Sequence, residues 1–332
     1  MQLSDNLDQE YNHPQDQDHD QDQEYPQPVH STEPILPLDQ PNSNKPTINH
    51  IVLSGGGAFG FSQYGALAHL NKEGYWNIEN IKSIHGTSIG AIFGTMISLK
   101  YDTSVMDDYI LKRPWNKVFN FDMYSVINSF HKRGIFDITV VENMFKPLFA
   151  GLDISLNVTM QQLYEYNQID LHLITTELDD FKTVDISHTT HPEWLVIEAM
   201  YASACLPTLF SPFKKDSKYY MDGGILCNYA VENCINLGIP NENILGLQLT
   251  KPINSVITTI LEDSSLLDYL FIALFKVIHK YMPIHKSNLK NEIQIPANTV
   301  SLYDIYLATS SIDERKRLYK LGVDIAKEFI SQ

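Results

Sequence analysis

A glycine-rich turn between a strand-like run and a helix-like run limits the possible folds of this chain more than any other feature. The stretch "IVLSGGGAFGFSQYGALAHL" begins at Ile51. Gly55, Gly57 and Gly60 spell G-x-G-x-x-G, the pattern with which a strand–turn–helix unit holds the phosphates of a dinucleotide. The same turn can instead present backbone N–H groups to an anion that forms only in a transition state. Both uses need a strand that leads directly into a helix, so the stretch predicts an α/β unit.

The alternation of strand-like and helix-like runs continues along the chain. "IKSIHG" is followed by "SIGAIFGTMISLKY", a helix-like run begins at Glu193, and further strand-like runs begin at Asp170, Thr183, Lys218 and Asn243. Strands that recur between helical segments are typical of an α/β domain with a mainly parallel sheet and helices on both faces. In such domains the functional residues follow the strand ends.

The first 47 residues differ in composition from the rest of the chain. "DQDHDQDQE" is repetitive, a Pro-rich segment follows, and residues 1–50 hold ten acidic residues against a single Lys. Such a segment buries too little apolar surface to offset the entropy of ordering, so we expect a disordered acidic tail rich in Gln, Asp and Pro over residues 1–47. One domain is expected over 48–332, with a motif-bearing core over about 51–237 and a helical C-terminal part over 238–332.

Composition excludes several classes of protein. A formal net charge of −16 disfavours binding to nucleic acid, which needs clustered Lys and Arg. Three cysteines without a C-x-x-C pair favour a reducing compartment over a disulfide framework. The N-terminus lacks the pattern of a secretory signal, and the most apolar run, from Tyr269, is far shorter than the ~20 residues of a membrane-spanning helix. We therefore expect a cytoplasmic or peripheral membrane protein, and the absence of metal-ligand spacing predicts neither a metal nor a cofactor.

"HGTSIGA" supplies a candidate nucleophile, Ser88, within a G-x-S-x-G pattern that runs from Gly86 to Gly90. At a sharp strand-to-helix turn the flanking residues must lack side chains, and the serine hydroxyl is exposed at the start of the helix. The alternative is an ordinary tight turn whose glycines serve helix packing. The apolar run before the pattern and the helical run after it favour the nucleophile.

The residues at the end of the second strand weaken the dinucleotide hypothesis. A dinucleotide-binding unit needs an acidic residue there to hold the ribose hydroxyls. This chain has Thr87 and Ser88 at that point, and Glu79 lies before the strand. We therefore interpret Gly55, Gly56 and Gly57 as an oxyanion hole whose N–H groups hold the charge that develops on a carbonyl oxygen under attack.

"YYMDGG" supplies a candidate base, Asp222, at the end of a strand. A carboxylate within hydrogen-bond reach of the Ser88 hydroxyl can accept its proton directly if burial raises its basicity, and no histidine is then required. The alternative is a simple turn, because Asp-Gly is a common turn dipeptide.

Taken together, "SGGGAFG", "GTSIG", "ASACLPTLFSP" and "MDGG" resemble the patatin-like phospholipase family from about Ile51 to Asn228. The resemblance implies a three-layer α/β/α fold and metal-independent hydrolysis of glycerolipid acyl esters, with membrane or micellar lipid as substrate. It implies Ser88 as nucleophile, Asp222 as its proton acceptor and the Gly55–Gly57 amides as the oxyanion hole. One departure is Phe59, where many members carry a basic residue.

Other interpretations of the same residues stay open. A Ser-Asp-His triad needs a histidine after Asp222, and His279 and His285 satisfy that order. His85 precedes Ser88 on the same strand, and we expect it in the core. A catalytically silent lipid- or partner-binding module would keep the same fold.

The helix expected from Ser264 to Met282 carries an apolar stripe at helical spacing. We expect this stripe to lie in the core, and the alternative is an interfacial lid that contacts lipid.

Overall fold

The computed structural model describes residues 46–120, 129, 131–250, 262, 266–281, 287–297 and 301–332. The tail predicted over residues 1–47 lies outside the described residues, apart from its last two. The strands are β1 His50–Leu53, β2 Ser83–Thr87, β3 Gly134–Phe136, β4 Asp170–Glu177, β5 Lys182–Ile186, β6 Thr208–Phe210, β7 Phe213–Lys215, β8 Lys218–Asp222, β9 Ile244–Thr250 and β10 Asn291–Pro296. The α-helices are α1 Gly60–Lys72, α2 Ile89–Ser98, α3 Thr103–Lys112, α5 Thr139–Ala150, α6 Met160–Asn167, α7 Val196–Ala204, α8 Val231–Asn236, α9 Leu266–Tyr281, α10 Leu302–Ser310 and α11 Ile312–Ile330. Short 3₁₀ helices are η1 Gly57–Phe59, η2 Ile78–Asn80, η3 Trp115–Lys117, η4 Gly223–Ile225 and η5 Asn241–Asn243.

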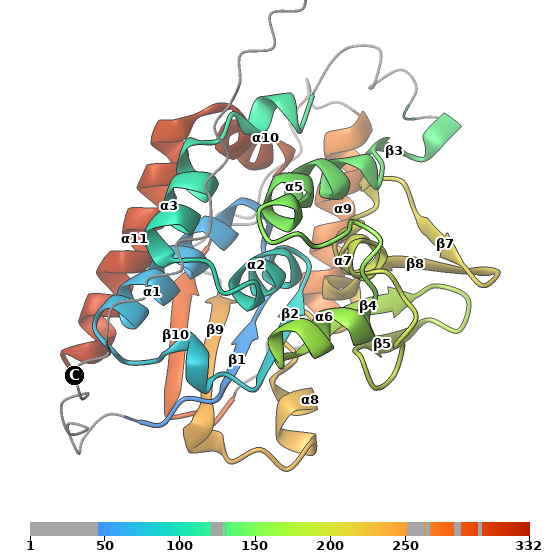
Figure 1. Cartoon of the computed structure of the whole chain (residues 1–332). Coiled ribbons are helices and arrows are strands. Elements are labelled where there is room, and N and C mark those ends of the chain that lie inside the picture. The colour runs from blue at the N-terminus through green and yellow to red at the C-terminus, as the bar shows by residue number, and fades with distance from the viewer. Residues whose placement is uncertain are drawn as a thin grey trace, which may run out of the picture.

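An eight-stranded central sheet forms the middle of the molecule (Figure 1). Its order is β10-β9-β1-β2-β4-β8-β7, with β5 also paired to β4. The pairs from β10 to β4 are parallel, whereas β5, β7 and β8 join as antiparallel strands. The prediction of a mainly parallel sheet is confirmed.

Strand β10 differs from the expectation of a helical C-terminal part over 238–332. It pairs with β9 from Asn291 to Pro296 at the outer side of the sheet. Alternate residues, including Ile293 and Ile295, are buried. Pro296, which has no backbone N–H to donate, ends β10 at the edge of the sheet. A run of only six residues is too short to stand out beside the long helical patterns that surround it.

Helices cover both faces of the sheet. Ile51 and Leu53 of β1 point to one face and pack in the large core with residues of α1 and α2. Val52 points the other way, as strand geometry requires, and packs with Tyr229 and with Val231 of α8. All three β1 side chains are fully buried, which explains the uninterrupted apolar run in the sequence. The three-layer arrangement agrees with the expected fold.

The helix expected from Ser264 to Met282 is present as α9, and a longer helix, α11, lies further along the chain. Helix α11 begins after Ser311, whose hydroxyl accepts a hydrogen bond from the Glu314 amide at 3.2 Å. In α9, Phe271 is buried, but Leu270 is 42% exposed and Val277 is 56% exposed. Leu270 and Phe271 belong to the apolar stripe expected in the core, whereas Val277 does not. The expectation therefore holds for Phe271 and not for Leu270.

Candidate active site

The turn between β2 and α2 holds Ser88 in a backbone conformation that few residues adopt. Its φ of 56° and ψ of −123° place the residue outside the ordinary regions for an L-amino acid. Gly90 lets the turn approach β1 closely, because a Cβ atom there would lie 2.5 Å from the Leu53 carbonyl oxygen. The tight approach that the G-x-S-x-G pattern predicts is present.

A second serine, which the sequence analysis did not single out, fixes this turn. The Ser88 backbone N–H donates to Ser203 Oγ at 3.1 Å, and the Ser203 hydroxyl donates to the Ile174 carbonyl at 2.6 Å. Ser203 is fully buried on α7. Ser203 lies in the "ASACLP" stretch. The sequence indicates a role for it only through the position of this stretch between the motifs that hold Ser88 and Asp222.

Strand register brings Asp222 to the level of Ser88. Thr87 of β2 pairs with Ile174 of β4, and the next β4 residue, Thr175, pairs with Asp222 of β8. Strand β8 runs antiparallel to β4 and pairs only with the last residues of β4. Asp222 therefore lies at the edge of the sheet where the parallel strands have their carboxyl ends. The sequence predicted Asp222 at a strand end but not the direction of its strand.

The two predicted side chains make direct contact. The Ser88 hydroxyl donates to Asp222 Oδ2 at 2.6 Å, and the Gly224 amide donates to Asp222 Oδ1 at 2.7 Å. The Asp222 side chain is buried, and its residue is only 3% exposed. Burial raises the pKa of Asp222 from 3.8 to about 6, and the hydrogen bonds from Ser88 and Gly224 oppose this rise. The raised pKa makes Asp222 a better proton acceptor than an exposed aspartate.

The three glycines of the first turn do not have equal roles. The Gly55 amide donates to the Asn228 carbonyl at 3.0 Å, and the Asn228 side-chain amide donates to the Gly55 carbonyl at 3.2 Å. Gly55 therefore ties two loops together, and its N–H group is not free for an oxyanion. Gly56 and Gly57 precede α1 at the start of η1, and both line the cavity described next.

A cavity of about 430 Å³ opens beside the Ser88–Asp222 pair. Its size falls in the range of small-molecule sites. Besides the pair and the glycines, its walls are mainly apolar and come from α2, α5, α9, α10 and the segment around β6. They include Ile92, Phe93, Met96, Trp115, Val141, Met144, Leu209, Phe210, Phe275 and Ile305.

Phe59, where the sequence departs from the pattern of the family that it resembles, has a packing role in this structure. It is buried in a small cluster with Ala297, Ala308 and Leu318. Phe59 therefore contributes to the packing of α10 and α11 against η1.

His85 belongs to a buried polar network on the sheet and makes no contact with Ser88. Its Nε2 lies 3.0 Å from Ser83 Oγ, and its ring stacks on His172 at 4.2 Å between centroids. Burial holds the pKa of His85 well below its usual value. The prediction of a core histidine is confirmed.

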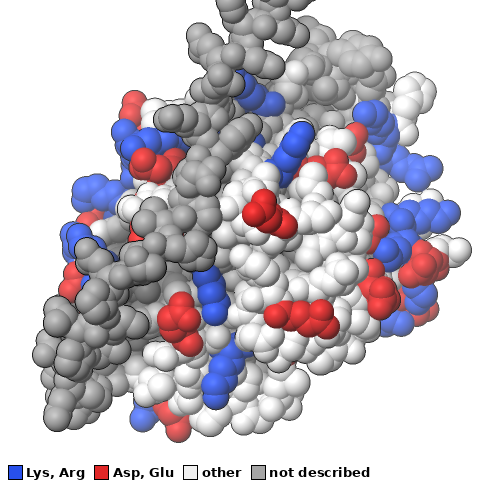
Figure 2. Space-filling view, in the orientation of Figure 1, with Lys and Arg blue, Asp and Glu red and all other residues white. Residues whose placement is uncertain are grey.

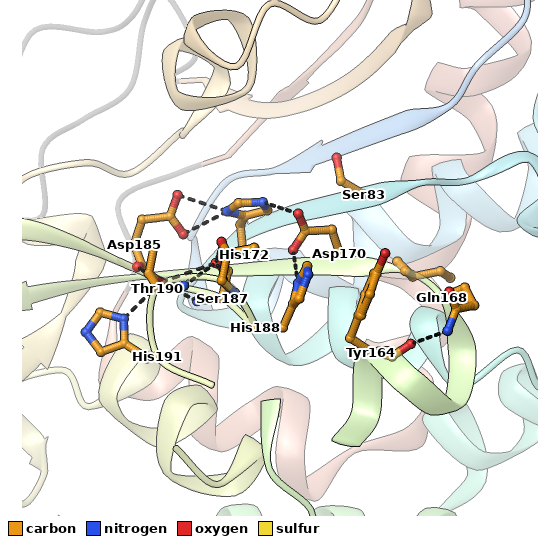
Figure 3. A network of polar contacts seen from close by, with 12 residues as sticks. Ser83, Tyr164, Gln168, Asp170, His172, Asp185, Ser187, His188, Thr190 and His191 are labelled. Atoms are coloured by element: carbon orange, nitrogen blue, oxygen red, sulfur yellow. Dashed lines mark hydrogen bonds and ion pairs between the residues drawn. The ribbon is translucent and has the colours of Figure 1, made fainter. Parts of the chain in front are cut away.

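The centre of this network is His172, which lies between the carboxylates of Asp170 and Asp185 (Figure 3). These carboxylates raise the pKa of His172 to about 9 against the opposing effect of burial, so the ring is an imidazolium at neutral pH. His188 extends the network, since its Nδ1 lies 2.8 Å from Asp170 Oδ1. The network ties β2, β4 and β5 together.

Two alternatives from the sequence gain no support from described contacts. His285 lies outside the described residues, and the side chain of His279 is not described, so neither can be placed near the pair. Glu79 lies in η2, exposed, with Lys100 Nζ at 3.8 Å. It is thus not at the end of β2, where a dinucleotide site needs an acid.

In the part of the chain that the structure describes, no group of three or more His, Cys, Asp or Glu side chains is arranged to hold a metal ion. No helix within the described residues has the length and apolar character to cross a membrane.

Two viral proteins are similar to this chain over just over half its length. An uncharacterized protein of Acanthamoeba polyphaga mimivirus is 26% identical over 184 residues, which is 55% of this chain and 60% of that protein. A probable lipid hydrolase of Invertebrate iridescent virus 6 is 26% identical over 188 residues, which is 56% of this chain and 62% of that protein. The similarity thus spans about three fifths of each relative.

Two solved structures are also similar, at low sequence identity. VipD from Legionella pneumophila has a TM-score of 0.49 at 16% identity, over 86% of this chain and 67% of that one. ExoU from Pseudomonas aeruginosa has a TM-score of 0.41 at 14% identity, over 87% of this chain and 54% of that one. The family model for patatin-like phospholipases matches residues 51–235, which include both glycine motifs, Ser88 and Asp222. The chain therefore belongs to the patatin-like phospholipase family.

Proposed function

We propose that this protein is a lipid acyl hydrolase that cleaves glycerolipid esters with Ser88 as nucleophile and Asp222 as base. The observation that carries the proposal is the 2.6 Å hydrogen bond between the two side chains at the edge of an apolar cavity. A direct contact of this kind needs no imidazole between serine and carboxylate. It therefore favours the Ser-Asp dyad over the Ser-Asp-His alternative.

The proposed reaction has two halves. In the first, Ser88 Oγ attacks the ester carbonyl carbon while its proton passes to Asp222 Oδ2, and the alcohol leaves with that proton. In the second, Asp222 takes a proton from water as the water oxygen attacks the acyl carbon of the acyl-enzyme. The bond from that carbon to Ser88 Oγ then breaks, Asp222 returns the proton to Ser88 Oγ, and the fatty acid leaves. Mechanistically, the burial that raises the Asp222 pKa favours both proton transfers.

The oxyanion hole is assigned to the amides of Gly56 and Gly57. They line the cavity beside Ser88 and precede α1, where N–H groups and the helix dipole favour a negative charge. Gly55 is excluded from this role because its amide is bonded to Asn228.

Lipid is the proposed substrate because the cavity walls suit an acyl chain. Large apolar side chains from several elements, such as Phe93, Met144 and Phe210, surround the space beside Ser88. The family and the viral relative described as a probable lipid hydrolase point to the same class of substrate.

The test is fatty-acid release from phosphatidylcholine vesicles in excess chelator. The intact chain should release fatty acid without a metal, and folded Ser88→Ala and Asp222→Asn variants should lose at least about a thousandfold in rate, as nucleophile and base variants commonly do. Full activity of either variant would refute the dyad, and activity that the chelator abolishes would refute a metal-independent mechanism.

The rival function is a catalytically silent lipid- or partner-binding module. A serine-directed fluorophosphonate distinguishes the two, because the proposed enzyme forms an adduct on Ser88. A folded chain that gives neither an adduct nor hydrolysis of any acyl ester would favour the silent module.

A further inference from the structure

Helix α9 is apolar on two opposite sides. On the inner side Phe271 is buried, and Phe275 and Ile278 line the cavity. The outer side carries four large apolar or aromatic residues with exposed fractions of 59, 48, 42 and 56%, which are Leu266, Tyr269, Leu270 and Val277. A surface helix ordinarily turns polar residues outward, so this outer side is suited to an apolar or interfacial environment.

Helix α10 repeats the same arrangement. Its inner residues Ile305 and Ala308 line the cavity, while Tyr303 is 66% exposed and Tyr306 is 48% exposed. Tyrosine is favoured where one end of a side chain meets an apolar phase and the other meets water. Both helices therefore line the space beside Ser88 with one side and present apolar or aromatic groups outward with the other.

Exposed cations lie on the elements that adjoin these helices. Lys276 is on α9 itself, Lys117 is on η3, which contacts α10, and Arg133 directly precedes β3. Strand β3 pairs with β6, and β6 contacts α9. Figure 2 shows Lys and Arg side chains along the side of the molecule on which Figure 1 labels β3, β7 and β8, with Asp and Glu side chains interspersed among them.

We infer that the outer sides of α9 and α10 form a docking surface for an anionic lipid membrane. This docking surface consists of Leu266, Tyr269, Leu270, Val277, Tyr303 and Tyr306. The aliphatic residues enter the boundary between head groups and acyl chains, and the tyrosines lie at the level of the head groups. The neighbouring cations complement anionic head groups, and each strengthens binding about fivefold when it lies near the surface.

The cavity identifies the occupant as lipid instead of a second protein. Because the inner sides of the same helices line the cavity, a lipid taken from a membrane on the docking surface reaches Ser88 along apolar walls. In this respect the inference rests on the proposed function. Its test measures binding alone, so that the two can fail separately.

The test is flotation of the Ser88→Ala protein with phosphatidylcholine vesicles, with and without phosphatidylglycerol. A Leu270→Glu/Val277→Glu variant should lose at least about tenfold in binding to both kinds of vesicle. Lys276→Glu should lose only the increment that phosphatidylglycerol adds. The matched control is Tyr166→Glu/Leu237→Glu, which changes two equally exposed apolar residues on other elements, and it should bind like the parent.

All these variants should keep the parental Tm, which shows that they are folded without recourse to activity. In the background with Ser88 intact, they should also hydrolyse a soluble short-chain ester at the parental rate. The inference is overturned if the parent does not float, if the Leu270/Val277 variant floats like the parent, or if the control loses binding equally. It is also overturned if that variant only disperses a dimer in size-exclusion chromatography. Vesicle binding through this surface without any ester hydrolysis would refute the proposed function and support the docking surface.

Discussion

Replacement of the proposed base by its neutral isostere should stabilise the fold while it removes activity. Asp222 is buried, and its pKa rises from 3.8 to about 6 because desolvation outweighs two hydrogen bonds. The carboxylate is therefore less stable in the folded protein than in the unfolded chain. Asp222→Asn removes this charge, keeps the shape of the side chain and can still accept a hydrogen bond from the Gly224 amide.

The magnitude follows from the pKa shift. About two pKa units at ~1.4 kcal/mol each give a cost of about 3 kcal/mol for the ionised Asp222 in the folded state. Because the pKa of Asp222 is higher in the folded protein than in the unfolded chain, ionisation of Asp222 lowers the stability of the folded state. This loss of stability is absent below about pH 4, grows between about pH 4 and 6, and is constant above pH 6. For a domain of this size the full gain corresponds to a rise in Tm on the order of 5 °C.

The assay is thermal denaturation of the parent and the Asp222→Asn variant from pH 4 to pH 8. The gap in Tm should open between pH 4 and 6 and stay open above that range. Asp153→Asn, which neutralises an exposed carboxylate, serves as the control and should show no such gap. A variant that is no more stable than the parent at pH 8, or a gap that does not change with pH, would refute the argument that burial raises the Asp222 pKa.

Three other predictions follow from the geometry. Ester hydrolysis should fall about tenfold per pH unit below pH 6 and stay level above it, since only ionised Asp222 accepts a proton; a rate that is flat down to pH 4.5 would contradict this. The pKa of His172 is raised to about 9, so protonated His172 stabilises the folded state. This stabilisation is complete below about pH 6.5 and is lost as the pH rises through 9. His172→Gln should therefore remove that part of the pH dependence of Tm. Gly90→Ala should unfold or inactivate the protein because its Cβ would lie 2.5 Å from the Leu53 carbonyl oxygen. Gly238 has a φ of 81°, and a Cβ atom added there would meet no atom within 4 Å, so Gly238→Ala should cost only about 1–2 kcal/mol of backbone strain. Equal losses of unfolding free energy for the Gly90 and Gly238 variants in urea denaturation would count against the close approach at Gly90.

Local patterns were sufficient where neighbouring residues decide the structure. The apolar run before Gly55, the helical spacing after it, and the small residues around Ser88 all act within a few residues along the chain. They predicted β1, α1, β2 and α2 correctly. Strand direction is different, because it depends on a partner that is distant in sequence. The antiparallel entry of β8 beside β4 and the addition of β10 to β9 therefore could not be predicted.

The sequence by itself determined which residue types could act in this protein and the local turns that present them. It singled out Ser88 and Asp222 as separate signals, each with an ordinary turn as the alternative. Only the tertiary structure decided that they meet, because the register of β2, β4 and β8 joins residues that lie 134 positions apart at 2.6 Å. The fold also raised the Asp222 pKa by burial and assigned the Gly55 amide to Asn228, and neither effect follows from the neighbours of a residue along the chain.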